Sequence, residues 1–518
     1  FIANHAGISG AALAWMGVKD IHIVDYHFID NTAVASGGAI YVDVGSDNDI
    51  IEDCTFEGNH LTNMSDKHNG GAIDCKGDNL TINSSSFKNN GAYTGGALYV
   101  GSTSHNVHVF DSNFTSNYAY GDGGALGLKA SALTINNTKF ISNTAVHNGG
   151  ALYAGGNGTD NSIYNSSFEN NSAGNHGGAI DWLASAGDFK YNNFIGNEAI
   201  YGGALYLNGV SSNSRLDSVY FKANKATKNG GAIDCNASMM GLNNTIFVEN
   251  EAGEYGAALC RETNATGGFG GNNTFIANYA RIAGPALAWL GVDGIKINNY
   301  TFINNTAGSS GGAIYVREDS PNCKVLNSRF ENNYITNMKN GQGGSIDWLG
   351  VNATIVNTTF KDSYAANGGI LYIAGDNANI TNVSFSGGYA FENGGAIYVN
   401  NADNITLSSV NISDTESRFN GAVYLIGCND SVLYNVSFNN VKASEDGASI
   451  MWVDSSNATI DSCIFMVSTS YHSGGAIYFD NMNDTVVKNS TFNDTKALYG
   501  NGGIIFVNGN VTLDNNTF

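Results

Sequence analysis

The sequence predicts an all-β fold, a parallel β-helix (β-solenoid) of about nineteen coils. Three observations predict it. A short motif recurs about every 27 residues, apolar residues alternate within it, and the 518 residues include only 2 prolines. Recurrence at this period indicates stacked units, and alternation indicates strands rather than helices. Scarce proline suits coils that each donate backbone N–H groups to a neighbour.

The first motif is Gly-Gly-Ala-Ile-Tyr-Val, as at residues 37–42. Its fourth position is almost always Ile, Leu or Val, its sixth is mostly apolar, and its fifth varies. Because successive strand residues point to opposite faces, we expect positions four and six to face a core and position five to face outward. The glycine pair predicts a tight corner. Nineteen copies begin at residues 10, 37, 70, 95, 123, 149, 177, 202, 230, 256, 284, 311, 343, 368, 394, 420, 447, 474 and 502.

The second motif, Phe-x-x-Asn, precedes most copies of the first by 8 to 10 residues, as in Phe28/Asn31 and Phe302/Asn305. We expect the phenylalanines to form a column inside the coils. Asparagine tolerates left-handed backbone geometry and therefore suits a turn between strands. Stacked asparagine side chains also hydrogen-bond along a ladder, as they do in cross-β stacks.

A single unit of this length cannot bury its apolar face alone, but stacked units can. We therefore expect one continuous solenoid over residues 1–518, a rod on the order of 90 Å at about 4.8 Å per coil. Residues 12–17 match residues 286–291, which predicts an internal duplication of 1–274 and 275–518, the second copy truncated. Both ends interrupt a repeat and show no polar cap, so we expect open strand edges that invite another chain.

Composition excludes several kinds of protein. The net charge is −22, and no basic footprint for nucleic acid is visible. No apolar run is long enough for a transmembrane segment. The histidines and cysteines lack metal-ligand spacing, so no metal, cofactor or catalytic site is predicted. Cys235 and Cys260 are expected on opposite faces, whereas Cys54 and Cys75 are either a pair or isolated buried thiols.

The two phased motifs resemble those of the chlamydial polymorphic outer-membrane proteins and of the adhesin-like surface proteins of methanogenic archaea. The resemblance covers nearly the whole chain. It implies a right-handed parallel β-helix, secretion to the cell surface, and a role in adhesion or surface structure. The chain departs from the pattern where Ser363, Gly388 and Ser468 replace the asparagine of Phe-x-x-Asn.

Sequons are one candidate functional feature. The chain holds 28 Asn-x-Ser/Thr sequons, and chance from this composition gives on the order of a dozen. They indicate a glycoprotein, or else they arise because turns need Asn and outward strand positions accept Ser and Thr. The glycosylation candidates are Asn83, Asn113, Asn165, Asn243, Asn299, Asn357, Asn404, Asn435, Asn489 and Asn510.

Position five of the first motif forms a second candidate feature, an outward stripe of Tyr and Asp. Aromatic faces beside carboxylates suit binding of a sugar or a protein. The alternative is that Tyr simply suits an exposed strand. The stripe consists of Tyr41, Asp74, Tyr99, Tyr153, Asp181, Tyr206, Asp234, Tyr315, Asp347, Tyr372, Tyr398, Tyr424 and Tyr478.

These features favour an extracellular, cell-surface, adhesin-like structural rod that mediates adhesion or surface-layer and filament contacts. Its expected partner is a host or microbial surface ligand, either a glycan or a protein. The alternative is a subunit that self-associates end to end into a filament or sheath. A polysaccharide lyase or hydrolase is less favoured, because basic residues are scattered and strict repetition works against a unique site. The chain is therefore not expected to be an enzyme.

Overall fold

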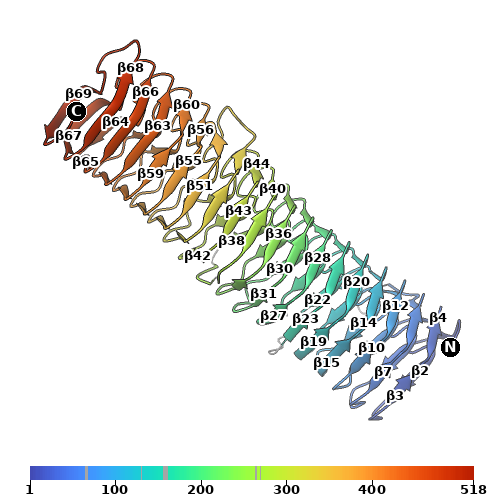
Figure 1. Ribbon diagram of the computed structural model, residues 1–518. Helices are drawn as coiled ribbons and strands as arrows, with labels where there is room; N and C mark the ends of the chain where they lie inside the picture. Colours follow the sequence, from blue (N-terminus) through green and yellow to red (C-terminus); the bar gives the residue numbers. More distant parts are fainter. Residues whose placement is uncertain (65–67, 130, 156–160, 263–264, 269) are drawn as a thin grey trace. The chain divides into compact units, whose positions relative to one another are not determined.

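The computed structural model describes residues 1–64, 68–129, 131–155, 161–262, 265–268 and 270–518. These residues form a right-handed parallel β-solenoid of about 18 turns with no helix, so the predicted fold class is confirmed (Figure 1). Accordingly, no described helix could cross a membrane. The chain divides into two compact units, Phe1–Gly253 with Ala257–Cys260, and Glu254–Gly256 with Arg261–Phe518. The internal duplication, with copies at residues 1–274 and 275–518, stays a prediction.

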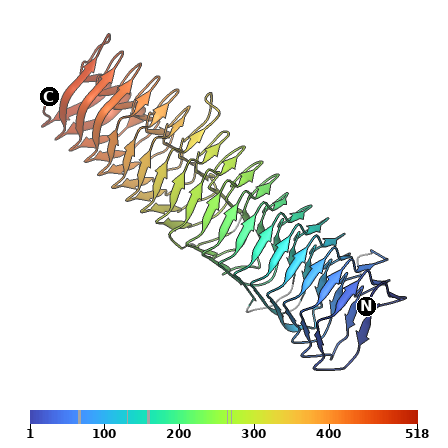
Figure 2. The ribbon, with the colours of Figure 1, turned by 45° about the vertical axis from the view of Figure 1, so that its right-hand side comes forward.

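A coil of the first unit contains four short strands. They are β6 (Ile40–Val42), β7 (Ile50–Glu52), β8 (Thr55–Glu57) and β9 (His60–Leu61). Each strand pairs in parallel with its counterpart one coil later; β6, for example, pairs in register with β10 (Ile73–Cys75). Figure 2 shows the matching strands of successive coils side by side. The solenoid therefore places corresponding residues of the repeat in columns.

The second unit repeats this plan with one change toward its end. Its regular coil contains β45 (Ile314–Val316), β46 (Lys324–Leu326), β47 (Arg329–Glu331) and β48 (Tyr334–Ile335). Later coils have longer strands, such as β63 (Ser437–Ala443), β66 (Ile464–Ser470) and β67 (Ile477–Lys488). In β63 and β66 one strand runs through the corner, whose residue keeps a positive φ of 53° (Asn440 and Val467). Val441 and Ser468 take the place of the ladder asparagine there.

The core consists of the columns that the sequence predicts. Positions four and six of the first motif, such as Ile40 and Val42, are fully buried. The rings of Phe28, Phe56 and Phe87 stack with centroids 4.7 and 4.6 Å apart and nearly parallel planes. Fully burying such a side chain stabilises a fold by about 1.5–3 kcal/mol. Packing of identical residues along the coils is therefore a principal source of stability.

Both glycines of the first motif have a steric role at the corner. Gly37 has a φ of 56°, in the left-handed region that glycine adopts at little cost. A Cβ on Gly38 would collide with the carbonyl oxygen of Gly71 in the next coil. The first glycine therefore makes the turn, and the second allows the coils to approach, as the predicted corner requires.

The asparagine of Phe-x-x-Asn forms a buried ladder, but it is not the left-handed residue of the turn. Asn59 Nδ2 donates to Asn90 Oδ1 at 3.0 Å and to Phe28 O at 2.8 Å, and Asn59 N donates to the same Asn90 oxygen at 3.0 Å. The left-handed residue is the one before the ladder position, such as Asp30 with a φ of 54°. The ladder was predicted correctly, whereas the predicted turn geometry was wrong by one residue.

Replacing one ladder asparagine tests this network. Asn117→Ala removes the oxygen that accepts from Asn90 N at 3.0 Å and from Asn90 Nδ2 at 2.9 Å. Buried donors without an acceptor cost about 1–3 kcal/mol each. We expect a loss of about 3 kcal/mol or more in unfolding free energy, measured by chemical denaturation, with faster hydrogen exchange at Asn90. The control Asn113→Ala, in the same coil but exposed, should stay within about 0.5 kcal/mol. Equal losses in both variants would contradict the role of the ladder.

Candidate functional site

Position five forms a column in register, but the column is not an open surface. Tyr41, Asp74 and Tyr99 are paired neighbours in the first unit. The expectation of outward exposure is wrong for six members, which are less than 9% exposed: Asp74, Tyr99, Asp181, Asp234, Asp347 and Tyr372. The other seven are half-buried: Tyr41, Tyr153, Tyr206, Tyr315, Tyr398, Tyr424 and Tyr478.

Side chains from neighbouring coils cover this column. The residue just before a glycine pair packs over position five of the next coil, as when the ring of His176 stacks on Tyr206 with centroids 4.3 Å apart. The hydroxyl groups are also engaged, because Asn236 Nδ2 donates to Tyr206 Oη at 3.0 Å. Strand alternation therefore predicts the side of the strand correctly but does not reveal what lies over it.

Burial changes the chemistry of the aspartates in the column. Burial raises the pKa of Asp74 to about 6 and that of Asp347 to about 7, and it raises the pKa of Asp181 well above its usual range. A hydrogen bond from Ser310 partly opposes the shift at Asp347. Near neutral pH Asp347 exists partly as an uncharged acid. The aspartates of the column are thus packed inside the fold, and ligand binding by its half-buried tyrosines stays a prediction.

The buried Asp347 predicts a pH-dependent stability. Its pKa in the folded chain, about 7, lies above the ordinary value of 3.8, so folding binds a proton. Its effect on stability is therefore neutral in acid, becomes more destabilising as pH rises from about 4 to 7, and is constant above pH 7. We expect Asp347→Asn to raise unfolding free energy at pH 8 by up to about 4 kcal/mol, at about 1.4 kcal/mol per pH unit between the two pKa values. Denaturation at pH 4 and pH 8 measures this difference.

Asp414→Asn, an exposed turn variant, controls for the loss of one negative charge. An Asp347→Asn variant with the same gain at pH 4 as at pH 8, or with no gain at either pH, would contradict the proposed protonation.

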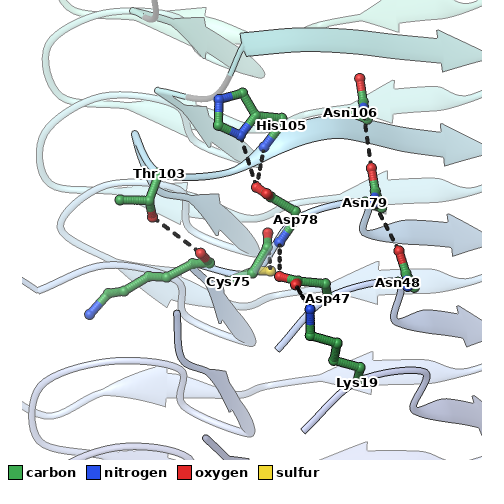
Figure 3. A network of polar contacts seen from close by, with 11 residues as sticks. Lys19, Asp47, Asn48, Cys75, Asp78, Asn79, Thr103, His105 and Asn106 are labelled. Atoms are coloured by element: carbon green, nitrogen blue, oxygen red, sulfur yellow. Dashed lines mark hydrogen bonds and ion pairs between the residues drawn. The ribbon is translucent and has the colours of Figure 1, made fainter. Parts of the chain in front are cut away.

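The exposed turns form a second ladder of polar side chains, separate from the buried one. Asn106 Nδ2 donates to Asn79 Oδ1 at 2.9 Å, and Asn79 Nδ2 donates to Asn48 Oδ1 at 2.8 Å (Figure 3). Beside it, Lys19 forms an ion pair with Asp47 at 2.6 Å. Exposed pairs of this kind contribute about 0–1 kcal/mol each. The turn ladder therefore aligns neighbouring coils without adding much stability.

Most of the ten candidate sequon asparagines belong to such turns. Six of the ten have positive φ values between 47° and 59°: Asn165, Asn299, Asn357, Asn404, Asn435 and Asn489. Their amides are engaged in hydrogen bonds, as when Asn357 Nδ2 donates to Asn327 Oδ1 at 3.0 Å. Asn83 Nδ2 donates to Glu52 at 2.9 Å, and Asn510 Nδ2 donates to Asp484 at 3.5 Å. Asn113 and Asn243 are exposed on strands.

The repeat itself explains many sequons. In Asn357-Thr358-Thr359-Phe360, the asparagine makes the turn, Thr358 is buried, and Thr359 begins the strand that contains the core phenylalanine. Thr358 Oγ1 donates to Val356 O at 3.0 Å. The same order occurs at 165–168, 435–438 and 489–492. Turn chemistry thus explains these four sequons without glycosylation, and glycosylation stays a prediction.

The cysteines offer no reactive group at the surface. Cys54 and Cys75 are buried thiols without a disulfide, so the second of the two alternatives, isolated buried thiols, is the one observed. Burial raises the pKa of Cys75 to about 12, which keeps it a neutral thiol. Within the described part of the chain, no group of three or more His, Cys, Asp or Glu side chains is arranged to hold a metal ion.

A hollow on the second unit is lined by residues of which sequence analysis singled out only Ser363. Tyr334, Tyr364 and Tyr389 line a volume of about 440 Å³ together with Asn304, Asn332, Asp362, Ser363 and Gly387. Each tyrosine directly follows the fourth position of Phe-x-x-Asn. Two of these positions, Ser363 and Gly388, are departures from the motif. The signal in the sequence that could have identified this column is the tyrosine that directly follows each of these two departures.

Comparison with known sequence families supports the repeat assignment. The right-handed β-helix region matches residues 344–518. The Chlamydia polymorphic membrane protein repeat matches residues 25–43, 165–181, 218–236 and 299–317. The first of these repeat matches includes both motifs, from Phe28 to the strand after Gly38. The chlamydial part of the predicted resemblance is therefore confirmed, and the archaeal part stays a prediction.

Individual known proteins are similar to this chain over different fractions of its length. The chain is 26% identical to the probable outer membrane protein pmp20 of Chlamydia pneumoniae, over 43% of this chain and 16% of that protein. The chain thus spans about a sixth of the length of this relative. Two structures of the PL6 family alginate lyase AlyGC align over 99% of the chain at 10% identity, with TM-scores of 0.20 and 0.17.

Proposed function

We propose that this chain is a surface-exposed, adhesin-like β-solenoid that presents its turns and strand faces to a ligand outside the cell. The observation that supports it most is the phased repeat shared with the chlamydial membrane proteins, found in both units. A relative described as a probable outer membrane protein supports a location at the cell surface. The low content of charged residues, 13%, and the regular polar turns fit a display scaffold.

A binding assay tests the proposal. Beads coated with residues 1–518 are mixed with animal cells, bacterial cells and immobilised extracellular-matrix components, and attachment is counted by flow cytometry or microscopy. We expect several-fold more attachment to at least one surface than for beads coated with an unrelated protein of similar net charge. That control matters because the chain has a net charge of −22, which alone changes nonspecific attachment. Attachment no greater than the control on every surface would contradict the adhesin-like role.

The expectation that the chain is not an enzyme is tested on the same material. The purified chain is incubated with acidic and neutral polysaccharides, with and without calcium, and chain length is followed by size-exclusion chromatography. We expect no shortening. Cleavage of any polysaccharide would replace the proposed function with an enzymatic one.

A further inference from the structure

Three tyrosines follow one another along one column of the second unit. They begin the short strands β48 (Tyr334–Ile335), β52 (Tyr364–Ala365) and β56 (Tyr389–Ala390), and each is paired with the next. The same column position holds Thr306 one coil earlier and Glu416 one coil later. The tyrosine run is therefore a local feature and not a property of the repeat.

The three rings leave aromatic surface accessible. Tyr334 and Tyr364 stack with centroids 4.7 Å apart and planes 16° apart. Tyr389 instead meets Phe391 edge to face, with centroids 4.9 Å apart and planes 86° apart. All three tyrosines are half-buried. The column thus presents three partly exposed aromatic rings along three successive coils.

Polar side chains border this aromatic surface. Asn304, Asn332 and Asp362 occupy the exposed turn position that precedes the buried ladder, in three successive coils. Together with the tyrosines they line the hollow of about 440 Å³. Pockets for small ligands usually measure about 300–1,000 Å³ and combine aromatic walls with a few polar groups. The hollow has the size and the composition of such a site.

The hollow lies where the repeat is interrupted. Ser363 replaces the ladder asparagine, and its Oγ lies 2.7 Å from the Oγ of Ser345. In the next coil Gly387 and Gly388 occupy the turn and ladder positions. A Cβ at position 387 would collide with Asp362 Oδ1, so only glycine fits beside that carboxylate. Small residues therefore create space next to the tyrosines.

We propose that this hollow binds a neutral oligosaccharide chain, an inference that names the ligand class of the proposed adhesin-like function. A sugar ring has an apolar C–H face, which packs on an aromatic ring, and hydroxyl groups, which pair with amides and carboxylates. The net charge of −22 disfavours an acidic glycan.

The surroundings favour a sugar over a protein partner. A stable protein interface buries about 800 Å² on each side and has an apolar centre. Between residues 300 and 400, all of which are described, Val351 is the single large apolar side chain classed as exposed, at 37%. The tyrosine hollow is thus a small amphipathic site on a polar surface.

Titration of the purified chain with chitohexaose, cellohexaose and mannohexaose tests the site, using calorimetry or tyrosine fluorescence. We expect at least one of these neutral hexasaccharides to bind. Tyr364→Ala and Asp362→Ala should each weaken that binding tenfold or more, and Tyr364→Phe, which keeps the ring, should weaken it less than threefold. The matched control is Tyr118→Ala on β17 (Tyr118–Ala119), the same column position in the first unit, where affinity should stay within twofold.

Three results would overturn the inference. The first is that no neutral hexasaccharide binds. The second is that binding is unchanged by Tyr364→Ala while Tyr364→Phe is folded. The third is that a uronic-acid hexasaccharide binds more tightly than every neutral one. The bead assay separates this site from the proposed function. If hexasaccharide binding survives Tyr364→Ala and Tyr364→Ala beads attach as well as the original chain, the inference fails and the adhesin-like function stands. If the chain binds a hexasaccharide but no surface, the site stands and the function fails.

Discussion

Parallel backbone pairing between coils is the constraint on which the rest of each unit depends. Every strand must offer its N–H and C=O groups in register to the next coil, so each coil has to repeat the path of its neighbour. The columns follow from this requirement. Identical phenylalanines come to lie about one strand spacing apart, as do Asn59 and Asn90, whose amide and carbonyl then bond. The sequence therefore repeats because the path of the backbone repeats from coil to coil.

The inward-facing columns were predictable because each of their residues packs against the equivalent residue of the next coil. Alternation placed Ile40 and Val42 in the core, and the recurring phenylalanine predicted the ring stack. The glycine pair was also interpretable, since a left-handed turn and a close approach of backbones both require it. The ladder asparagine was located correctly, but spacing alone could not say that the residue before it, such as Asp30, makes the left-handed turn.

The outward face was harder to predict because its environment comes from residues far away in the sequence. Asp74 and Asp347 occupy the expected side of their strands, yet both are buried. Their cover comes from the loop before another coil's glycine pair, as with Ser310 beside Asp347. The alternation of residues along a strand predicts the side to which each side chain points. It does not predict which residues pack over that side chain. A similar limit applies to the sequons, because the sequence does not distinguish a glycosylated asparagine from one that makes a turn, as Asn165 and Asn357 do.

A strictly repeated surface has the same chemistry at every coil, so it can bind a ligand specifically only where neighbouring coils differ. In the second unit such a difference occurs where Ser363 and Gly388 replace the ladder asparagine and tyrosines occupy three successive coils. The buried ladder there gives way to a bond between Ser345 and Ser363, while the phenylalanine stack beneath continues through Phe360 and Phe385 with centroids 5.0 Å apart. The core columns can therefore keep the coils in register while the turn residues change. Departures from the repeat are, for this reason, the most informative positions for function in a solenoid.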